Sequence, residues 1–200
     1  GIDSSFEELD NPIDLFKNWF SEADKKEIND PNAFAVATSN KDNQPNVRMV
    51  LLKGLSDKGF VFYTNFNSKK GNELKSNQKA SMCFHWKSLR RQVRVLGNVE
   101  EVTKAEADDY YNSRPYKNKI SAWASSQSQV LDDRETFLEK IKEFEKKYPD
   151  KKDVPRPPHW SGWRLLPSEI EFWVDGEGRI HERLNYKNIN NKWKKEILYP

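Results

Sequence analysis

Cationic side chains recur in short motifs along this chain of 200 residues, and each motif could bind an anion. In the first motif, at 48–53, four apolar residues separate Arg48 from Lys53. Side chains alternate between the two faces of a strand, so these two cations are expected on opposite faces. They could then bind two different anions, although charges at a sheet edge are also commonly left in solvent.

A second motif joins Tyr63 and Thr64 to the sequence Ser68-Lys69-Lys70. Ser68 is a favourable helix cap, and the free N–H groups of a helix N-terminus attract anions. Two lysines beside that terminus would suit a phosphate group. A strand end followed by a turn and a solvated lysine pair explains the same residues equally well.

Two further motifs are weaker on their own. Tyr110 and Arg114 are four residues apart and therefore share one face of a helix, where hydroxyl and guanidinium groups could hold a phosphate. Between 90 and 95, charged and apolar residues alternate as on a half-exposed strand. The amide of Gln92 could bind a ring edge that carries both donors and acceptors. A surface Tyr–Arg pair and an ordinary sheet strand are the alternatives.

The fifth motif combines Trp173 with the segment 179–183. If that segment is a strand, Arg179, His181 and Arg183 point to the same side. Two arginines that flank a histidine repel each other unless an anion lies between them. Trp173 offers a flat surface for stacking, although a solvent-facing stripe of charged residues remains an alternative.

The overall composition excludes several classes of site and partner. The 34 basic and 31 acidic residues nearly balance, so no nucleic-acid partner is expected. The single cysteine excludes a disulfide within the chain, and the three histidines lie too far apart for a metal site. No apolar stretch is long enough to span a membrane, and the first residues do not resemble a signal peptide. We therefore expect a cytoplasmic location.

The elements that must position these motifs are mostly strands. Asn11-Pro12 begins a predicted amphipathic helix over 12–28. Short runs rich in Val, Phe, Tyr and Leu then predict five strands, joined by turns and by a polar helix over 68–77, at 33–38, 47–53, 59–64, 80–86 and 91–102. Long helices between the strands are missing, which favours an antiparallel sheet closed into a barrel over a parallel fold.

The second half of the chain adds helices and the closing strands. Thr103 and Glu106 form a capping-box pattern before a helix to residue 111, and two more helices are predicted over 116–128 and 132–148. The predicted closing strands are 162–166, 170–174, 179–184 and 192–199, with a hairpin turn at 175–178. We expect a single domain over 1–200, with a flexible N-terminal segment over 1–11.

Six separated motifs, in this order, resemble the pyridoxamine 5′-phosphate oxidase family of FMN-binding split-barrel proteins. They lie at 48–53, 62–65, 91–93, 113–115, 122–128 and 170–183. The resemblance covers nearly the whole chain. It implies a mainly β fold, a split antiparallel barrel of Greek-key type with peripheral helices. It also implies a homodimer that holds FMN at the subunit interface.

The resemblance further implies an activity and a set of site residues. The activity is oxidation of pyridoxamine or pyridoxine 5′-phosphate to pyridoxal 5′-phosphate, with oxygen as acceptor and hydrogen peroxide as product, in vitamin B6 salvage. The implied FMN contacts are Arg48, Met49, Val50, Leu51, Leu52, Lys53, Tyr63, Thr64, Lys69, Lys70, Gln92, Gln127, Ser128, Trp173 and Arg183. The implied substrate contacts are Lys53, Tyr110, Arg114, Asn118, Arg179, Ile180 and His181, of which Arg179 and His181 are the implied catalytic residues.

Three other functions fit parts of the pattern. The nearest is a split-barrel flavin reductase or oxidase for another substrate, and the second is a flavin- or heme-binding module without catalysis. A nucleic-acid binder that uses residues 90–94 is the third, and the nearly neutral charge argues against it. The chain departs from the family at Asn118, often serine there, and at Lys69, often arginine.

Overall fold

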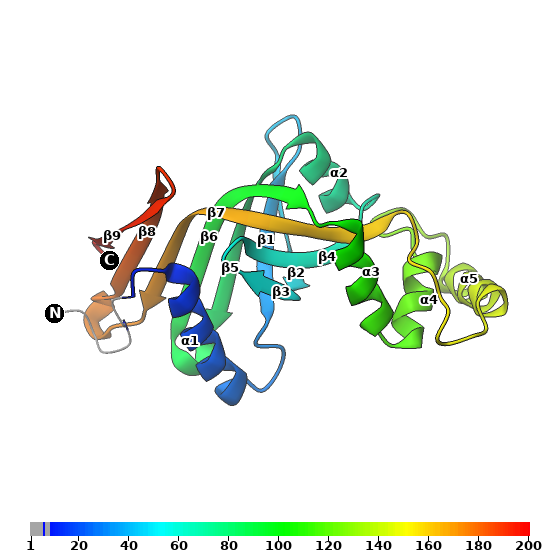
Figure 1. The fold of residues 1–200 in the computed structure, drawn as a ribbon, viewed down its shortest axis with the longest axis horizontal. Coiled ribbons are helices and arrows are strands. Elements are labelled where there is room, and N and C mark those ends of the chain that lie inside the picture. The colour runs from blue at the N-terminus through cyan, green and yellow to red at the C-terminus, as the bar shows by residue number, and fades with distance from the viewer. Residues whose placement is uncertain (1–5, 7–8) are drawn as a thin grey trace.

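One antiparallel sheet dominates the computed structural model, which describes residues 6 and 9–200 (Figure 1). The main path of the sheet has the order β2-β1-β5-β6-β7-β4-β3, and β8 and β9 extend it from β7. The strands of the described part are β1 (Ala33–Ser39), β2 (Pro45–Leu51), β3 (Gly54–Ser56), β4 (Gly59–Asn65), β5 (Lys79–Trp86), β6 (Arg91–Glu101), β7 (Trp160–Val174), β8 (Glu182–Ile189) and β9 (Lys192–Leu198).

Four of the five described helices begin after a residue whose side chain caps the N-terminus, and the helix that begins at Tyr116 is the exception. The side chain of Asn11 accepts a hydrogen bond from the backbone of Ile13, and Thr103 and Glu106 form the predicted capping box. The helices are α1 (Pro12–Lys26), α2 (Lys69–Ser76), α3 (Lys104–Ser113), α4 (Tyr116–Ala124) and α5 (Arg134–Lys147), with short 3₁₀ turns η1 (Lys87–Leu89) and η2 (Glu177–Arg179). No helix in the described ranges is long and apolar enough to cross a membrane.

Strand β7 connects the two ends of the molecule. One edge of β7 pairs with β6, while its other edge pairs first with β4 and then with β8. Helices α3, α4 and α5 gather near the start of β7, whereas β8 pairs with the second half of β7 and β9 follows β8 at the other end of the molecule (Figure 1). The sequence had suggested two strands at 162–166 and 170–174, but the structure has one, because the β6–β7 pairing continues past Pro167 through a register shift at Gly97.

Gly97 permits that shift, since a Cβ atom there would lie 2.1 Å from the carbonyl oxygen of Leu166. The bulge bends the sheet, which curls without pairing its two end strands, β2 and β3, in the described part. The predicted antiparallel, mainly β architecture is therefore confirmed. The short strand β3 was not predicted, because three residues carry too little pattern to recognise.

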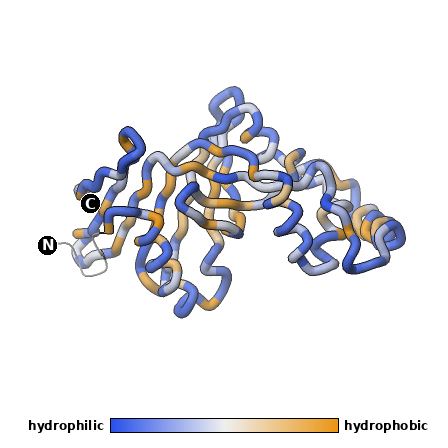
Figure 2. Tube along the Cα trace, in the orientation of Figure 1, coloured by the Kyte–Doolittle hydropathy of each residue, from blue (hydrophilic) through white to orange (hydrophobic). Residues whose placement is uncertain are grey.

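Aromatic side chains form most of the core between α1 and the sheet. Phe16 of α1 contacts the rings of Phe60 and Phe84, and Trp19 packs edge-on against Phe172. Figure 2 shows apolar residues along α1 and the central strands, whereas the connections at the sheet margins are mainly hydrophilic. The burial of these apolar side chains stabilises the sheet that carries the candidate site.

The predicted N-terminal segment lies partly outside the described residues. Of residues 1–11, the structure describes 6 and 9–11, and there Phe6 packs against Trp19 while Leu9 accepts a hydrogen bond from Tyr186. The predicted flexibility of this segment and the single-domain organisation stay predictions.

The prediction of a strand over 179–184 was wrong at its start. Strand β8 begins at Glu182, and Arg179 ends a 3₁₀ turn with a positive φ of 62°. Gly178, at φ 65°, takes a conformation that favours glycine and turns the chain away from an extended path. The connection is therefore longer than the expected hairpin turn at 175–178. Alternation along one strand does not place residues 179, 181 and 183 on a common face.

Candidate active site

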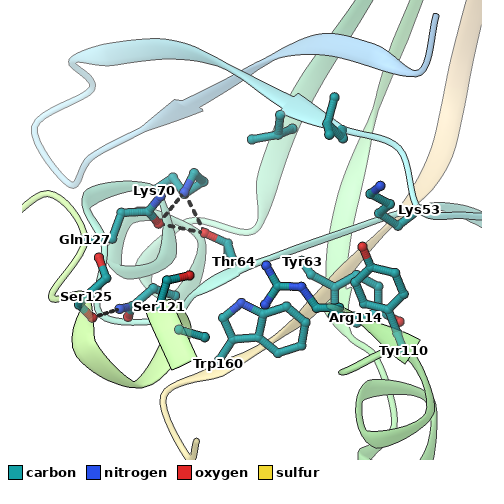
Figure 3. A pocket seen from close by; sticks show the side chains of 14 residues that line it. Lys53, Tyr63, Thr64, Lys70, Tyr110, Arg114, Ser121, Ser125, Gln127 and Trp160 are labelled. Carbon is teal, nitrogen blue, oxygen red and sulfur yellow. Dashed lines mark hydrogen bonds between the residues drawn. The ribbon is translucent and has the colours of Figure 1, made fainter. Parts of the chain in front are cut away.

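A cavity of about 320 Å³ lies where β2 and β4 approach the helices α2, α3 and α4. Its lining is mixed, with charged groups at both ends and aromatic rings along one wall (Figure 3). Small-ligand sites are commonly concave, with a few convergent polar groups. The lining residues are Val50, Leu51, Lys53, Tyr63, Thr64, Asn65, Lys70, Tyr110, Arg114, Ser121, Ala122, Ser125, Gln127 and Trp160.

Lys70 and its partners form one end of the cavity. The ammonium group of Lys70 donates to Thr64 Oγ1 at 2.5 Å and to Gln127 Oε1 at 2.9 Å (Figure 3). Burial, reinforced by the nearby charge of Arg48, lowers the pKa of Lys70 to about 8. A buried cation beside another cation is stabilised by an anion, so this end favours a phosphate group.

A second hollow, of about 430 Å³, adjoins this end and shares Val50, Lys70 and Gln127 with the first. It is also lined by Arg48 and Lys69. Its other lining residues are Asn46, Val47, Met49 and Ser128. The two hollows thus place the cations of β2 and of the first turn of α2 around one space.

Arg48 is held by a chain of hydrogen bonds that ends at a buried carboxylate. Its Nη1 atom donates to Thr38 Oγ1 at 2.6 Å, and Thr38 donates to Glu73 Oε2 at 2.8 Å. Asn46 donates to the other oxygen of Glu73 at 2.7 Å. Glu73 therefore links α2 to β1 and β2 and orients the arginine at the edge of the second hollow.

Lys53, Tyr110 and Arg114 lie at the other end of the cavity (Figure 3). Arg114 Cζ is 4.8 Å from the ring centroid of Trp160, and Arg114 Nη1 donates to the carbonyl of Asn118 at 3.4 Å. Lys53 lies beyond the end of β2, so strand alternation does not reach it. Lys53 and Arg114 could bind one anionic group from two sides.

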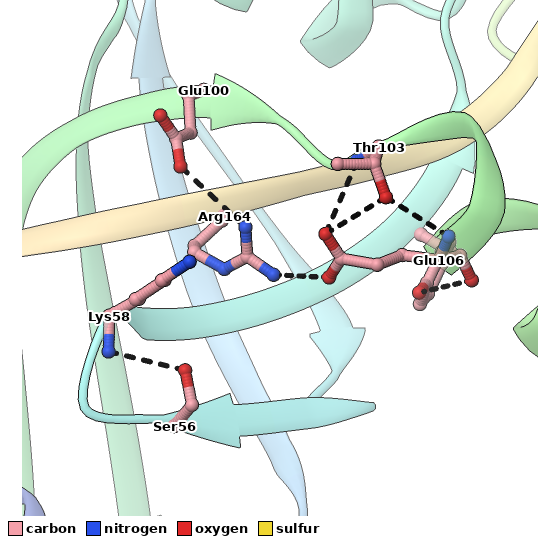
Figure 4. A network of polar contacts seen from close by, with 7 residues as sticks. Ser56, Lys58, Glu100, Thr103, Glu106 and Arg164 are labelled. Atoms are coloured by element: carbon pink, nitrogen blue, oxygen red, sulfur yellow. Dashed lines mark hydrogen bonds and ion pairs between the residues drawn. The ribbon is translucent and has the colours of Figure 1, made fainter.

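A polar network fixes α3, the helix that carries Tyr110, against the sheet (Figure 4). Arg164 of β7 forms ion pairs with Glu100 and Glu106. Burial alone would raise the pKa of Glu106, but hydrogen bonds from Arg164 and Thr103 lower it. The carboxylate thus stays ionised and holds the first turn of α3, so the cationic end of the cavity rests on a rigid support.

The cations around the two hollows share one electrostatic feature. These cations are Arg48, Lys53, Lys69, Lys70 and Arg114. Within residues 6 and 9–200, none of them forms a salt bridge with a carboxylate. Clustered cations without carboxylate partners repel one another, and anionic ligands relieve that repulsion.

A second group of predicted residues lies at the far end of β7. Trp173 pairs with Gln92 of β6 and with Arg183 of β8, and the ring of His181 lies 4.8 Å from that of Trp173. Here Arg183 has a carboxylate partner, and His181 lies close to a carboxylate. Arg183 donates to Glu171 at 2.6 and 3.0 Å, and His181 Nδ1 lies 3.1 Å from Asp175 Oδ1.

The structure therefore divides the predicted site residues between two places. The two hollows bring together Arg48, Met49, Val50, Leu51, Lys53, Tyr63, Thr64, Lys69, Lys70, Tyr110, Arg114, Gln127 and Ser128. The residues that do not line them are Leu52, Gln92, Asn118, Trp173, Arg179, Ile180, His181 and Arg183. Leu52 is buried in the core, whereas Asn118 is exposed and Ile180 is 72% exposed.

Sequence reasoning missed several residues that line the first cavity. Ser121 lies one helical turn beyond Asn118 and reaches the cavity where Asn118 does not. Trp160 was the larger omission. It ends a proline-rich connection and begins β7, and its only sequence signal is an aromatic residue directly before a strand.

Comparisons with known proteins identify the family. The family model described as pyridoxamine 5′-phosphate oxidase matches residues 20–148, and the pyridoxine 5′-phosphate oxidase C-terminal dimerisation region matches residues 160–200. The pyridoxine/pyridoxamine 5′-phosphate oxidase of Pelagibacter ubique (strain HTCC1062) is 58% identical over 100% of this chain and 97% of its own length. The protein of the same name from Sinorhizobium fredii (strain NBRC 101917 / NGR234) is 51% identical over 98% of this chain and 95% of its own length.

Solved structures agree with the family match. PhzG from Burkholderia lata 383, in complex with tetrahydrophenazine-1-carboxylic acid, superposes with a TM-score of 0.92 and 31% identity, covering 100% of this chain and 98% of that one. An FMN-binding protein from Nostoc punctiforme superposes with a TM-score of 0.74 over 92% of this chain and 97% of that one, at 16% identity, and supports the fold alone. The predicted split barrel is confirmed, and the chain belongs to the pyridoxamine 5′-phosphate oxidase family.

Proposed function

We propose that this chain is an FMN-dependent oxidase that converts pyridoxamine 5′-phosphate and pyridoxine 5′-phosphate to pyridoxal 5′-phosphate, with oxygen as acceptor and hydrogen peroxide as product. One observation supports this most strongly. Two groups of cations that form no salt bridge with a described carboxylate lie at opposite ends of two adjoining hollows, and the cofactor and the substrate each carry one phosphate group. Full-length relatives that are more than half identical carry the same activity in their names.

The residues around the second hollow fit the phosphate of FMN. Arg48 and Lys70 supply two charges, and Lys69 lies beside them at the start of α2. Ser128 and Gln127 offer further hydrogen-bonding groups from the turn after α4. When bound, FMN supplies the two-electron acceptor that the side chains of this protein lack, and passes the electrons to oxygen.

The other end of the cavity fits the phosphate of the substrate. Lys53 and Arg114 would neutralise its charge, and the hydroxyl group of Tyr110 would add a hydrogen bond. These contacts position the substrate and exclude water from its charged end. Asn118 remains a proposed contact through its side-chain amide, although in this structure only its backbone carbonyl contacts Arg114.

A second copy of the chain completes the site. Trp173 lies near the end of β7, beside Gln92 of β6 and Arg183 of β8, and none of the three lines the cavity of its own chain. The matched C-terminal segment is a dimerisation region. The outward side chains of β2 suit a covered face, because Val47 is 68% and Met49 is 64% exposed. A two-fold dimer would bring the end of β7 from one chain to the cavity of the other.

In that dimer, Arg179 and His181 would lie over the substrate ring. Arg179 is exposed at the surface of its own chain, and its guanidinium would orient the substrate and stabilise charge near the ring. His181 is held against Trp173 and beside Asp175, which suits a group that positions the substrate or handles a proton. A cytoplasmic location fits an enzyme of coenzyme salvage whose one cysteine is unpaired.

An anaerobic titration tests the proposal. The protein is loaded with FMN, pyridoxamine 5′-phosphate is added without oxygen, and the visible flavin band is followed. We expect the band to bleach and to return when air is admitted, with one hydrogen peroxide formed per turnover. Bound FMN whose band does not bleach with either phosphorylated vitamer would contradict the substrate assignment and favour a flavin enzyme for another substrate.

A further inference from the structure

Trp160 occupies a position that no predicted contact explains. It is the first residue of β7, pairs with Asn65 at the end of β4, and is only 6% exposed, yet it lines the cavity. Its backbone carbonyl accepts a hydrogen bond from Arg156 at 2.7 Å. The indole is thus fixed by its own strand and by the preceding loop.

The ring of Trp160 forms the floor of the cavity beneath the proposed phosphate-binding groups (Figure 3). Tyr63 lies 5.2 Å from it with an angle of 11° between the planes, and Tyr110 lies 6.0 Å from it at 10°. Tyr63 and Tyr110 stack on each other at 4.2 Å. Arg114 Cζ lies 4.8 Å from the same indole ring, so four side chains share one aromatic platform.

Gly162, two residues after Trp160, lets the ring of Tyr63 lie close against β7. A Cβ atom on Gly162 would lie 2.8 Å from Cε1 of Tyr63 and 3.1 Å from a methyl group of Val102. Tyr63 could not then keep its present position against the strand. The close approach of Gly162 and Tyr63 indicates that the ring arrangement is built into the β4–β7 pairing.

Arg114 depends on this platform because it has few other contacts. The single hydrogen bond that its guanidinium makes within the described chain, to the carbonyl of Asn118, is long at 3.4 Å. A carboxylate partner would orient the guanidinium but would also occupy the N–H groups that a phosphate needs. Contact between the guanidinium and an aromatic face orients the group and leaves its N–H edge free.

We propose that Trp160 is a positioning residue that orients Arg114 and Tyr110 for the substrate phosphate, and so sets the preference for phosphorylated over unphosphorylated vitamers. This inference rests on the proposed function of the cavity. Trp160 holds the phosphate-binding groups in the geometry that the bound state requires, which reduces the ordering entropy lost on binding.

The test compares Trp160→Leu with Trp160→Phe in the FMN-loaded dimer. Trp160→Leu is expected to raise KM for pyridoxamine 5′-phosphate about tenfold, with kcat and FMN affinity within about twofold of wild type. Trp160→Phe keeps a flat ring and should recover most of the loss. Oxidation of pyridoxamine, which lacks the phosphate, should change little in either variant. Equilibrium binding of pyridoxal 5′-phosphate should weaken in parallel with KM, without depending on turnover.

A double-mutant cycle separates positioning from general loss of structure. In the Arg114→Ala background, Trp160→Leu should add less than about threefold to KM, because the group it orients is gone. Trp123→Leu is the matched control. Trp123 packs in the same hydrophobic cluster as Trp160, but it stacks on Phe144 at 5.6 Å and does not line the cavity. It should lower stability by a similar amount and leave KM unchanged.

Two results would overturn the proposal while leaving the proposed function intact. One is a Trp160→Leu enzyme whose KM for pyridoxamine 5′-phosphate and affinity for pyridoxal 5′-phosphate equal those of wild type. The other is the same loss with and without Arg114, or with and without the substrate phosphate, which would indicate a structural role only. A wild-type enzyme that oxidises neither phosphorylated vitamer would instead refute the proposed function.

Discussion

The cations at the two ends of β7 differ in whether they form ion pairs with carboxylates. Around the cavity at its start, Lys53, Lys70 and Arg114 form no salt bridge with any described carboxylate. At its other end, Arg183 donates hydrogen bonds to Glu171 through two nitrogens, and Asp175 forms an ion pair with Arg90. The cations of the first region are open to anionic ligands, whereas Arg90 and Arg183 of the second already have carboxylate partners.

This difference indicates how one site can be divided between two copies of a chain. Cations without carboxylate partners keep their donors free for phosphate groups and depend on ligands to relieve their repulsion. Neutralised cations can be brought to an interface without the high cost of desolvating an isolated charge. We therefore propose that the chain carries a phosphate-binding half, with Lys53, Lys70 and Arg114. Its ring-covering half, with Arg179 and His181, would act in the site of the partner.

The largest effects should come from the phosphate-binding half. Lys53→Ala and Arg114→Ala are each expected to raise KM for pyridoxamine 5′-phosphate about hundredfold, because each removes a charge-assisted contact with the phosphate. FMN should remain bound in the Arg114 variant. Steady-state kinetics and the flavin spectrum check both points. If KM is unchanged in both variants, the phosphate assignment at this end of the cavity is wrong.

The ring-covering half should show its effect in turnover. Arg179→Ala is expected to lower kcat/KM by more than tenfold, or more than ~1.4 kcal/mol, because a charged group over the reacting ring is lost. Arg179→Lys keeps the charge and serves as the control. Near wild-type turnover of Arg179→Ala would contradict its proposed role.

Lys70 gives the phosphate-binding half a dependence on pH. With a pKa of about 8 in the free protein, Lys70 loses its charge as the pH rises through that value, and FMN affinity should fall with it. The expected fall is about tenfold between pH 7 and pH 9, measured by fluorescence titration of FMN. Lys70→Arg stays charged and should flatten the profile. Tighter binding at pH 9 than at pH 7 would have the wrong sign for this account.

The smallest expected effect concerns stability. Arg183→Ala should lower the free energy of unfolding of the FMN-free protein by about 1 kcal/mol, because Glu171 is buried and retains only Arg94, at 3.8 Å. Lys53→Ala removes no ion pair and should change it by less than about 0.5 kcal/mol. Urea denaturation compares the two variants. Equal losses of unfolding free energy in the two variants would contradict the view that only the cation at the far end of β7 is paired with a carboxylate.

Much of the fold follows from local sequence, and the parts that do not have identifiable causes. The caps at Asn11 and Thr103 and the alternating apolar runs predicted the helices and most strands. The prediction of a strand over 179–184 was wrong at its start because Gly178 takes a positive φ and Gly176 allows the close approach of the Ile180 carbonyl. Residue alternation alone does not reveal either effect. Trp160 escaped notice because its role depends on rings from β4 and α3, which only the tertiary structure brings together.

Only part of the arrangement of the candidate site could be predicted from the sequence motifs. The first-half motifs converge within one chain, since β2, β4 and α2 are neighbours around the cavity. The motif around Trp173 and Arg183 does not join them, because β7 carries it to the far end of the sheet. In the proposed dimer its place in the site would depend on a partner chain, which no pattern within one sequence encodes.

Mixed dimers test this division of the site most directly. Chains with Lys53→Ala and Arg114→Ala are combined, by co-expression, with chains that carry Arg179→Ala and His181→Ala, and oxidation of pyridoxamine 5′-phosphate is measured. Each parent dimer should be nearly inactive. A random mixture should recover about a quarter of wild-type activity, because each mixed dimer contains one site with both halves intact. No recovery, with mixed dimers shown to form, would mean that each site is built within one chain and would contradict the account.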